Sequence, residues 1–465
     1  EVLELVLEGD RSHARERLAE LTDSAIETTG RGVDLTQIDL SGCNLSGFDL
    51  RGAVLNRASL YGTDLSGADL SGASLVCAGM ERTRLAGARL RGAYAHAVAV
   101  QSSDLSGADL SGLVDATGSL LHGCNLAGAS LAGAVLAGAS FYQCDLRTTN
   151  AGGADVRGGM FNECHMDGVD LRDARVGEAA IIRCRLETAR LDGASGDGLT
   201  VHHPTGADGL GLEGAHLDGL TLRGVKARGV RAQGLTAAGI DVQSCDLPGA
   251  DLTRAHLPYG RWRQVGLEGA QLTGATVGDT VWQDVSGAGA SLRNATGEGL
   301  LAADCSLRGS DFASFAGRYA TFRNCDLAEA DFAAAYLYRG AFVGDPPRSM
   351  SLVRSRFDGA NLVQAYVAAD LTGASLRGAQ CTYARLNQTV FEAADLRGAT
   401  TFGASAVKTD FTKARLGGQR GVVFADRCPG LADALQDSAD EQAPRLAEFV
   451  EELQALLDRQ PSKST

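Results

Sequence analysis

The sequence has few of the residues that fill the core of an ordinary globular protein. Only 5% of its 465 residues are aromatic, and only 8 are proline. No run of about 18 apolar residues occurs, which excludes a membrane-spanning helix. The start, EVLELVLEGD, lacks both the basic segment of a signal peptide and an initial Met, so we expect a cropped or processed chain.

Positive charge is also scarce. Lys and Arg number 43 against 57 Asp and Glu, giving a formal charge of −14. A negative chain is not drawn to phosphates or to anionic lipid, so we expect no direct binding to nucleic acid and no membrane association.

Familiar catalytic and cofactor motifs are missing as well. The sequence contains no G-x-x-x-x-G-K-[ST], no H-E-x-x-H and no G-x-G-x-x-G within a βαβ pattern, and each of these motifs has a defined chemical role. We therefore predict that the protein is not an enzyme and that it binds no cofactor.

What the sequence does have is an apolar residue at every fifth position, a repeat that we call the five-residue beat. In TDLSGADLSGASL, residues 63–75, leucine returns at Leu65, Leu70 and Leu75. Helices place apolar residues about every 3.6 positions and strands every 2, so neither structure explains the spacing. The beat runs from residue 35 to about 416, gains one residue within 111–121 and another within 201–212, and loses one near 365–369.

A small residue precedes each of these central positions by two. Two residues apart on an extended chain means the same face, so the small and the large side chain point inward together. The next inward residue comes three positions later, which requires a corner in every unit. The pattern predicts a coil of short stacked sides.

Spacings of 20 residues indicate how many sides one turn has. Cys124, Cys144, Cys164 and Cys184 are 20 apart, as are Phe141 and Phe161. Like residues stack on like residues in a parallel coil, so 20 residues per turn imply four sides of five residues.

The units CNLSG, ADLSG, CNLAG, CDLAE and ANLVQ resemble the A(D/N)Lxx unit of the pentapeptide-repeat proteins, over residues 31–420. The resemblance implies an all-β solenoid, a right-handed quadrilateral parallel β-helix, with short α-helical caps at both ends. We expect a helical cap at 1–30, the β-helix at 31–423, and a cap or dimerisation segment at 424–465.

Both ends lose the five-residue beat. Residues 2–28 fit two short helices that break at Gly9–Asp10. A C-terminal helix carries an apolar stripe, which predicts a cap on the last coil or, because family members often pair through this end, a homodimer interface. The stripe consists of Leu446, Phe449, Val450, Leu453 and Leu457. The segment 344–355, GDPPRSMSLVRS, keeps the beat and predicts a local bulge without a long loop.

Eight of the eleven cysteines occupy the small inward position, where packing explains them. A metal ladder at residues 124–184 is the alternative, but the column lacks histidine and CxxC spacing. Buried thiols indicate a reducing compartment, which predicts a cytoplasmic protein. The eight are Cys43, Cys124, Cys144, Cys164, Cys184, Cys245, Cys305 and Cys325.

One basic stretch interrupts the mixed charge of the repeats. It is either ordinary solvation of outward side chains or a docking patch for an acidic partner, and the first interpretation is favoured. Its residues are Arg223, Lys226, Arg228, Arg231, Arg261 and Arg263, the last two flanking Trp262.

The high content of Ala and Gly is compatible with a bacterial source. The resemblance implies a protein that works through its surface. Some family members are DNA mimics that bind DNA gyrase or topoisomerase IV and inhibit them or protect them from poisons, a form of antibiotic resistance. The alternative is a structural scaffold or docking platform for another protein or peptide. Mimicry requires outward acids, and the candidates are Asp64, Asp69, Asp104, Asp109, Asp311, Asp331, Asp370 and Asp395.

Overall fold

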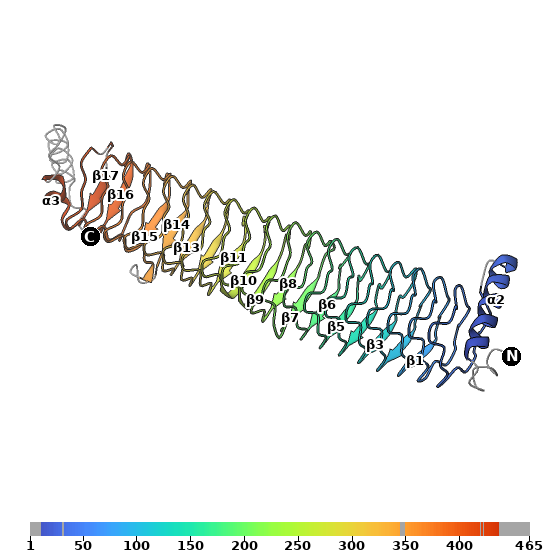
Figure 1. Ribbon diagram of the computed structural model, residues 1–465. Coiled ribbons are helices and arrows are strands. Elements are labelled where there is room, and N and C mark those ends of the chain that lie inside the picture. The colour runs from blue at the N-terminus through green and yellow to red at the C-terminus, as the bar shows by residue number, and fades with distance from the viewer. Residues whose placement is uncertain (1–10, 30–31, 345–348, 419, 422, 437–465) are drawn as a thin grey trace, which may run out of the picture. The chain divides into compact units, whose positions relative to one another are not determined.

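The fold is known from a computed structural model, which describes residues 11–29, 32–344, 349–418, 420–421 and 423–436. The chain divides into two compact units, unit 1 over Glu1–His256 and unit 2 over Leu257–Thr465. In each unit the chain winds into a parallel β-solenoid (Figure 1). The predicted fold class is confirmed.

Unit 1 contains one described helix and nine short strands. These are α2 (Arg11–Thr29), β1 (Gly79–Glu81), β2 (Ala99–Gln101), β3 (Leu120–His122), β4 (Ser140–Tyr142), β5 (Met160–Asn162), β6 (Ala180–Ile182), β7 (Thr200–His202), β8 (Thr221–Arg223) and β9 (Asp241–Asp246).

Unit 2 contains eight strands and one described helix. These are β10 (Arg261–Gly266), β11 (Val281–Gln283), β12 (Leu301–Ala303), β13 (Thr321–Arg323), β14 (Ala341–Val343), β15 (Tyr366–Ala368), β16 (Ala404–Val407), β17 (Val423–Asp426) and α3 (Leu431–Gln436).

Each five-residue unit contains one tight corner and forms backbone hydrogen bonds with the next turn of the coil. The Ala68 N–H donates to the Leu65 carbonyl at 3.0 Å and closes the corner, while the Leu65 N–H donates to Arg84 of the next turn at 2.7 Å. Gly67 lies in the corner at φ 64°, a conformation that costs glycine little. Leu65 and Ala68 are both buried, so leucine and alanine fill the interior as predicted.

Successive turns stack with a repeat of 20 residues. The backbone N–H of Thr83 donates to the hydroxyl of Ser103, 20 positions on, and Phe141 pairs with Phe161 in parallel register. One turn therefore holds four units, which confirms the four-sided coil. Each turn adds about 4.8 Å, the spacing of paired strands.

The three predicted gains and losses of one residue appear in the structure as changes in the pairing between turns. Tyr94 pairs with Asp115 and Arg185 with Gly206, each one residue beyond the usual register, whereas Ser351 pairs with Asp370, one residue short of it. A single inserted or lost residue changes the register of one turn, and the turns beyond it resume the 20-residue spacing.

The prediction for residues 344–355 is wrong. Asp331 accepts a hydrogen bond from Arg356, 25 positions on, and β14 pairs with β15 at the same offset. This turn therefore contains five residues more than its neighbours, which is an inserted segment and not a local bulge. An insertion of one full period leaves the beat unchanged, so the sequence pattern does not reveal it.

Helix α2 covers the first turn of unit 1 (Figure 1). Leu18 and Thr22 are buried, and the Thr22 hydroxyl donates to the Asp49 carbonyl at 3.2 Å. α2 is the second of the two predicted N-terminal helices, whereas the first and the Gly9–Asp10 break lie outside the described residues. The division at residues 30 and 423 stays a prediction.

At the other end of the chain, α3 follows the last strand and buries Ala434. The predicted stripe from Leu446 to Leu457 lies outside the described residues. None of the helices in the described part of the chain has the length and hydropathy that crossing a bilayer requires.

Candidate functional site

The eight candidate aspartates share one structural role. Each carboxylate accepts the backbone N–H two residues on, as Asp69 accepts from Ser71 at 3.0 Å and Asp109 from Ser111 at 3.0 Å. This is the Asx turn, in which a short carboxylate or amide side chain stabilises a corner of the chain. The same contact is made by Asp64, Asp104, Asp311, Asp331, Asp370 and Asp395. The aspartates are therefore explained by the fold before any partner is considered.

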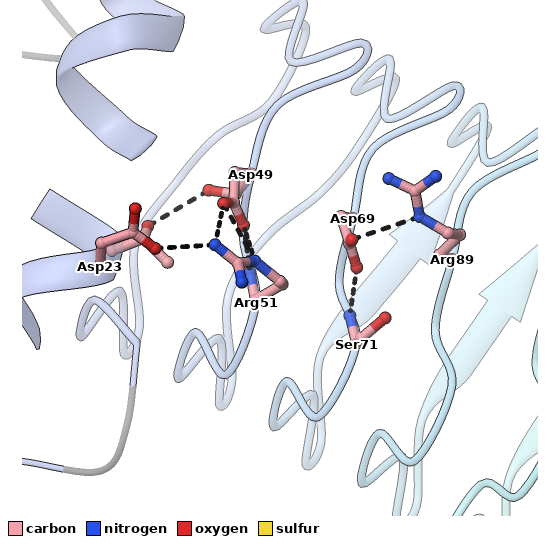
Figure 2. A network of polar contacts seen from close by, with 7 residues as sticks. Asp23, Asp49, Arg51, Asp69, Ser71 and Arg89 are labelled. Carbon is pink, nitrogen blue, oxygen red and sulfur yellow. Dashed lines mark hydrogen bonds and ion pairs between the residues drawn. The ribbon is translucent and has the colours of Figure 1, made fainter. Parts of the chain in front are cut away.

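Arginines neutralise several of these acids. The Arg89 guanidinium donates to Asp69, one turn below, at 3.2 Å (Figure 2). Asp395 accepts from both Arg397 and Arg377, and these hydrogen bonds hold the pKa of its carboxyl well below the usual range. Arginines lie within 4.0 Å of Asp64, Asp311 and Asp331 as well. Asp104 and Asp109 have no arginine partner within the described residues.

A related network fastens α2 to the repeats. The Arg51 guanidinium donates to Asp49 and reaches Asp23 of α2 at 2.7 Å (Figure 2). The hydrogen bonds that Arg51 donates to Asp49, together with the negative charge of Asp49, raise the pKa of Arg51, which stays protonated. Carboxylates near the start of the repeats thus hold the helix in place.

The six residues of the predicted basic stretch fall in both units. In unit 1, Arg223 lies 3.6 Å from Asp241, and Arg231 lies 3.3 Å from Glu213, while Lys226 and Arg228 belong to the same turn. In unit 2, Arg261 and Arg263 are exposed on either side of the buried Trp262. Acids accompany the cations in unit 1, so the favoured interpretation as solvated surface fits, and a docking role stays a prediction.

Cysteines share an inward column with hydroxyl residues, which the sequence analysis missed. The thiol of Cys164 donates to the Phe141 carbonyl, 23 positions back, at 3.4 Å. Thr63, Thr83 and Ser103 donate across the same interval in earlier turns. The alignment of Thr, Ser and Cys every 20 residues was the available signal, and these cysteines serve as small buried donors.

All eleven cysteines are free. Burial raises the pKa of the Cys381 thiol to about 12, so it remains protonated at neutral pH. Across the residues that the structure describes, no group of three His, Cys, Asp or Glu side chains is placed to hold a metal ion.

A hollow in unit 1 lies inside the coil. It measures about 50 Å³ and is lined almost entirely by apolar side chains, including Leu90, Ala95, Val100 and Ala116. Ala95 and Ala116 occupy positions that leucine fills elsewhere, so the hollow is a packing defect. The hydroxyl of Ser119, which also lines it, donates to the Ala95 carbonyl at 2.7 Å.

Exposed aromatic side chains gather on unit 2, at one corner of the solenoid. The Arg318 guanidinium lies 4.7 Å from the ring centre of Tyr319 and 5.7 Å from that of Tyr338. Arg339 lies 5.2 Å from the Tyr338 ring. Together with Tyr336 and Gln364 these residues form what we call the tyrosine–arginine cluster, which the sequence analysis missed.

Hydrogen bonds hold the cluster together. The Gln364 carbonyl oxygen accepts from Arg339 at 2.6 Å and from the Tyr338 hydroxyl at 3.1 Å. A hydrogen bond from Arg318 at 2.8 Å lowers the pKa of the Tyr319 phenol. Tyr319 and Tyr336 remain 38% and 45% exposed. The cluster thus offers ordered aromatic and cationic side chains to solvent.

Comparison with known proteins identifies the repeat. A family model described as pentapeptide repeats matches in 8 copies, over residues 34–72, 73–112, 115–150, 351–392 and 369–400. No curated protein matches the sequence.

Three solved structures are among those similar to the chain. HetL, a pentapeptide repeat protein involved in heterocyst differentiation regulation from the cyanobacterium Nostoc sp. strain PCC 7120, is 23% identical over 58% of this chain and 88% of its own, with a TM-score of 0.18. QnrB1, a plasmid-mediated fluoroquinolone resistance protein, is 15% identical over 46% and 93%, with a TM-score of 0.27. A pentapeptide repeat protein of the Arabidopsis thaliana thylakoid lumen is 31% identical over 21% and 65%, with a TM-score of 0.16.

The matched repeats agree with the structure. Most of their units carry leucine or phenylalanine at the buried centre, and four of them make one turn of the parallel coil. The chain belongs to the pentapeptide-repeat protein family.

Proposed function

We propose that this chain is a nonenzymatic cytoplasmic protein that binds another protein through side chains projecting from its repeats. The tyrosine–arginine cluster is the observation that carries the proposal. Tyrosine and arginine are enriched among the residues that dominate binding energy in protein interfaces. The free, buried cysteines fit a reducing compartment.

The chemistry of the cluster indicates the kind of partner. Arg339 has no acidic partner in the described part of the chain, and Arg318 has one distant carboxylate, Glu298, at 4.0 Å. A partner that brings a carboxylate would complete both guanidinium groups, while its apolar atoms would lie on the tyrosine rings. We therefore expect a partner surface that combines acidic and apolar side chains.

Photo-crosslinking tests this proposal. Replacing Tyr336 by p-benzoylphenylalanine should capture one defined protein in cells, and purified captured protein should bind the chain directly. Arg339→Glu should weaken that binding about tenfold or more, as loss of an interface anchor does. Thr296, which occupies the same outward position two turns earlier, is the matched control site. Equal labelling from positions 296 and 336 would overturn the proposal.

The narrower proposal is DNA mimicry, with DNA gyrase or topoisomerase IV as the partner. Support comes from aspartates that stack on one another in neighbouring turns, as Asp311 does on Asp331, with the ~4.8 Å step of paired strands. The arginine pairs of Asp69, Asp331 and Asp395 weaken it, because a paired carboxylate does not resemble a bare phosphate. Asp104 and Asp109 are the acids left to carry this role in unit 1.

Supercoiling by bacterial DNA gyrase separates the two versions. Added protein should inhibit the enzyme, or protect it from a cleavage-stabilising poison, only if the mimicry proposal holds. Asp104→Asn and Asp109→Asn remove charge but keep the corner, because Asn44 and Asn125 already make the same turn contact. Lost activity in these variants would support mimicry, whereas no effect of the unmodified protein at large excess would exclude it for the enzyme tested.

A further inference from the structure

Strands β2 to β7 of unit 1 present a surface without formal charge. In each of the strands β1 to β8, the residues immediately before and after the buried central residue point outward. We call the surface formed by these outward side chains the strand face. From β2 to β7 none of these side chains carries a formal charge at neutral pH, in a chain whose net charge is −14. Leu120 is 50% exposed, Met160 45% and Tyr142 36%. Exposed apolar patches of this kind mark contact surfaces.

Large and small side chains alternate along one of the two rows of the strand face. Leu120, Ser140, Met160 and Ala180 follow one another in parallel register, so they form one row across β3 to β6. The neighbouring row contains His122, Tyr142, Asn162 and Ile182. If the first row lies opposite a second copy of itself in reverse order, each large side chain meets a small one.

A two-fold axis produces that arrangement. We place it in the plane of the face, parallel to the strands, between β4 and β5. Leu120 of one copy then lies over Ala180 of the other, and Met160 lies over Ser140. Contacts related by such an axis occur twice, which is the usual geometry of homodimers.

The charged ends of the strand face match under the same axis. Glu81 on β1 of one copy lies opposite Arg223 on β8 of the other. Glu81 is exposed and has no ion pair within the described residues, and Arg223 is 46% exposed beside Asp241. If the two copies instead ran in the same direction along the coil axis, Glu81 of one copy would lie over Gly79 of the other. Glu81 would then have no counterion.

We propose that two copies of this chain associate through the strand face, antiparallel and related by this axis. The complementary row of Leu120, Ser140, Met160 and Ala180, with Glu81 opposite Arg223 at the rim, specifies a second copy over an unrelated partner. The proposal does not depend on the tyrosine–arginine cluster.

Sedimentation velocity of the full-length protein tests association. We expect a monomer–dimer equilibrium, and Met160→Arg should raise its Kd at least tenfold by placing two charges in the apolar centre. Tyr94→Arg, at a 47% exposed site outside the strand face, should leave the Kd unchanged. A protein that stays monomeric at about 100 μM would overturn the proposal, as would a dimer indifferent to Met160→Arg, which would point to the C-terminal segment instead.

Charge exchange tests the orientation. Glu81→Arg and Arg223→Glu should each weaken the dimer about threefold to tenfold, and the double variant should recover most of the loss. If the double variant is no tighter than either single variant, the antiparallel orientation is wrong.

A disulfide tests the register directly. Leu120→Cys together with Ala180→Cys should give a covalently linked dimer under mild oxidation. Within one chain these positions are three turns apart, about 14 Å, which is too far for a disulfide. Leu120→Cys alone should give no link above the background from the exposed native Cys77. Equal linking by the single and double variants would overturn the register.

Discussion

Phe332 stacks on Phe357, with ring centres 4.8 Å apart and ring planes at 4° to each other. The two residues are 25 positions apart in the sequence, whereas stacked residues in most other turns are 20 apart. The same stack continues below, where Phe312 and Phe332 lie 4.7 Å apart. The extra five residues therefore leave the core continuous. They change the length of one turn and not the packing within it.

Deletion of residues 345–349 should consequently be tolerated. Gly344 would then connect directly to Met350, which is fully buried at the inward position of its unit. We expect the free energy of unfolding to change by less than about 1 kcal/mol, because loop length contributes little to stability. Urea denaturation followed by circular dichroism measures it.

The control is a deletion of four residues, 345–348. It would shift Met350 and Leu352 out of the interior and should cost several times more stability. Equal losses from the two deletions would contradict the idea that a whole period was added.

The carboxylate of Asp395 gives the C-terminal part of the repeats a dependence on pH. Its pKa is depressed in the folded state by Arg397 and Arg377. A depressed carboxyl stabilises the fold above its unfolded pKa, near 3.9, and that contribution is lost as the pH falls toward the folded value. Asp395→Asn should therefore cost about 1 kcal/mol at pH 7 and progressively less below about pH 4.

Asp109→Asn is the matched control, because Asp109 makes the same Asx turn without an arginine. Its effect should be near zero at both pH values, since asparagine keeps the turn contact. Urea unfolding at pH 7 and at about pH 3 provides the comparison. A loss that is the same for both variants would mean that the arginine pairs do not stabilise the fold.

The fastening of α2 predicts a local effect of Arg51→Ala. Removing the guanidinium breaks the contacts with Asp23 and Asp49, so α2 should exchange its amide hydrogens about threefold to tenfold faster. Arg91→Ala is the control, because Arg91 is an exposed arginine at the same position two turns later. Unchanged exchange in α2 after Arg51→Ala would show that Leu18, Thr22 and the hydrogen bond from Arg15 to the Gly47 carbonyl hold the helix without Arg51.

The sequence predicts the solenoid, its four sides and its three gains and losses of one residue because each of these alters or follows the five-residue beat. It does not reveal the insertion at 345–349, which equals one period. Contacts between turns join residues about 20 positions apart. The pairs Asp69–Arg89 and Arg318–Tyr338 can therefore be predicted only after the length of one turn is known and the outward residues are aligned by it. Other contacts depend on the positions of individual side-chain atoms and cannot be predicted from the repeat. An example is Gln364, which accepts hydrogen bonds from both Tyr338 and Arg339 in the tyrosine–arginine cluster.

The donor column makes a prediction about buried cysteines. Cys164→Ala removes a donor to the Phe141 carbonyl and should cost about 1 kcal/mol. Cys164→Ser should cost less, because Ser103 fills the same position in an earlier turn with a hydrogen bond to Met80. Thermal unfolding of the two variants measures the difference. If alanine and serine are equally tolerated, the column is explained by size alone.

The hollow beside Ala95 predicts a stabilising substitution. Leucine occupies most central positions of the coil, and Ala95→Leu would place three more carbon atoms in a space of about 50 Å³ lined by Leu90 and Val100. We expect the free energy of unfolding to rise by about 1 kcal/mol, since filling a cavity recovers apolar burial. Ala134→Leu is the control, because Ala134 is fully buried at a small inward position and does not line the hollow, so leucine there should destabilise the fold by overpacking. Opposite signs for the two substitutions would show that the interior is under-filled at this turn, and a loss of stability for both would show that small residues are required there.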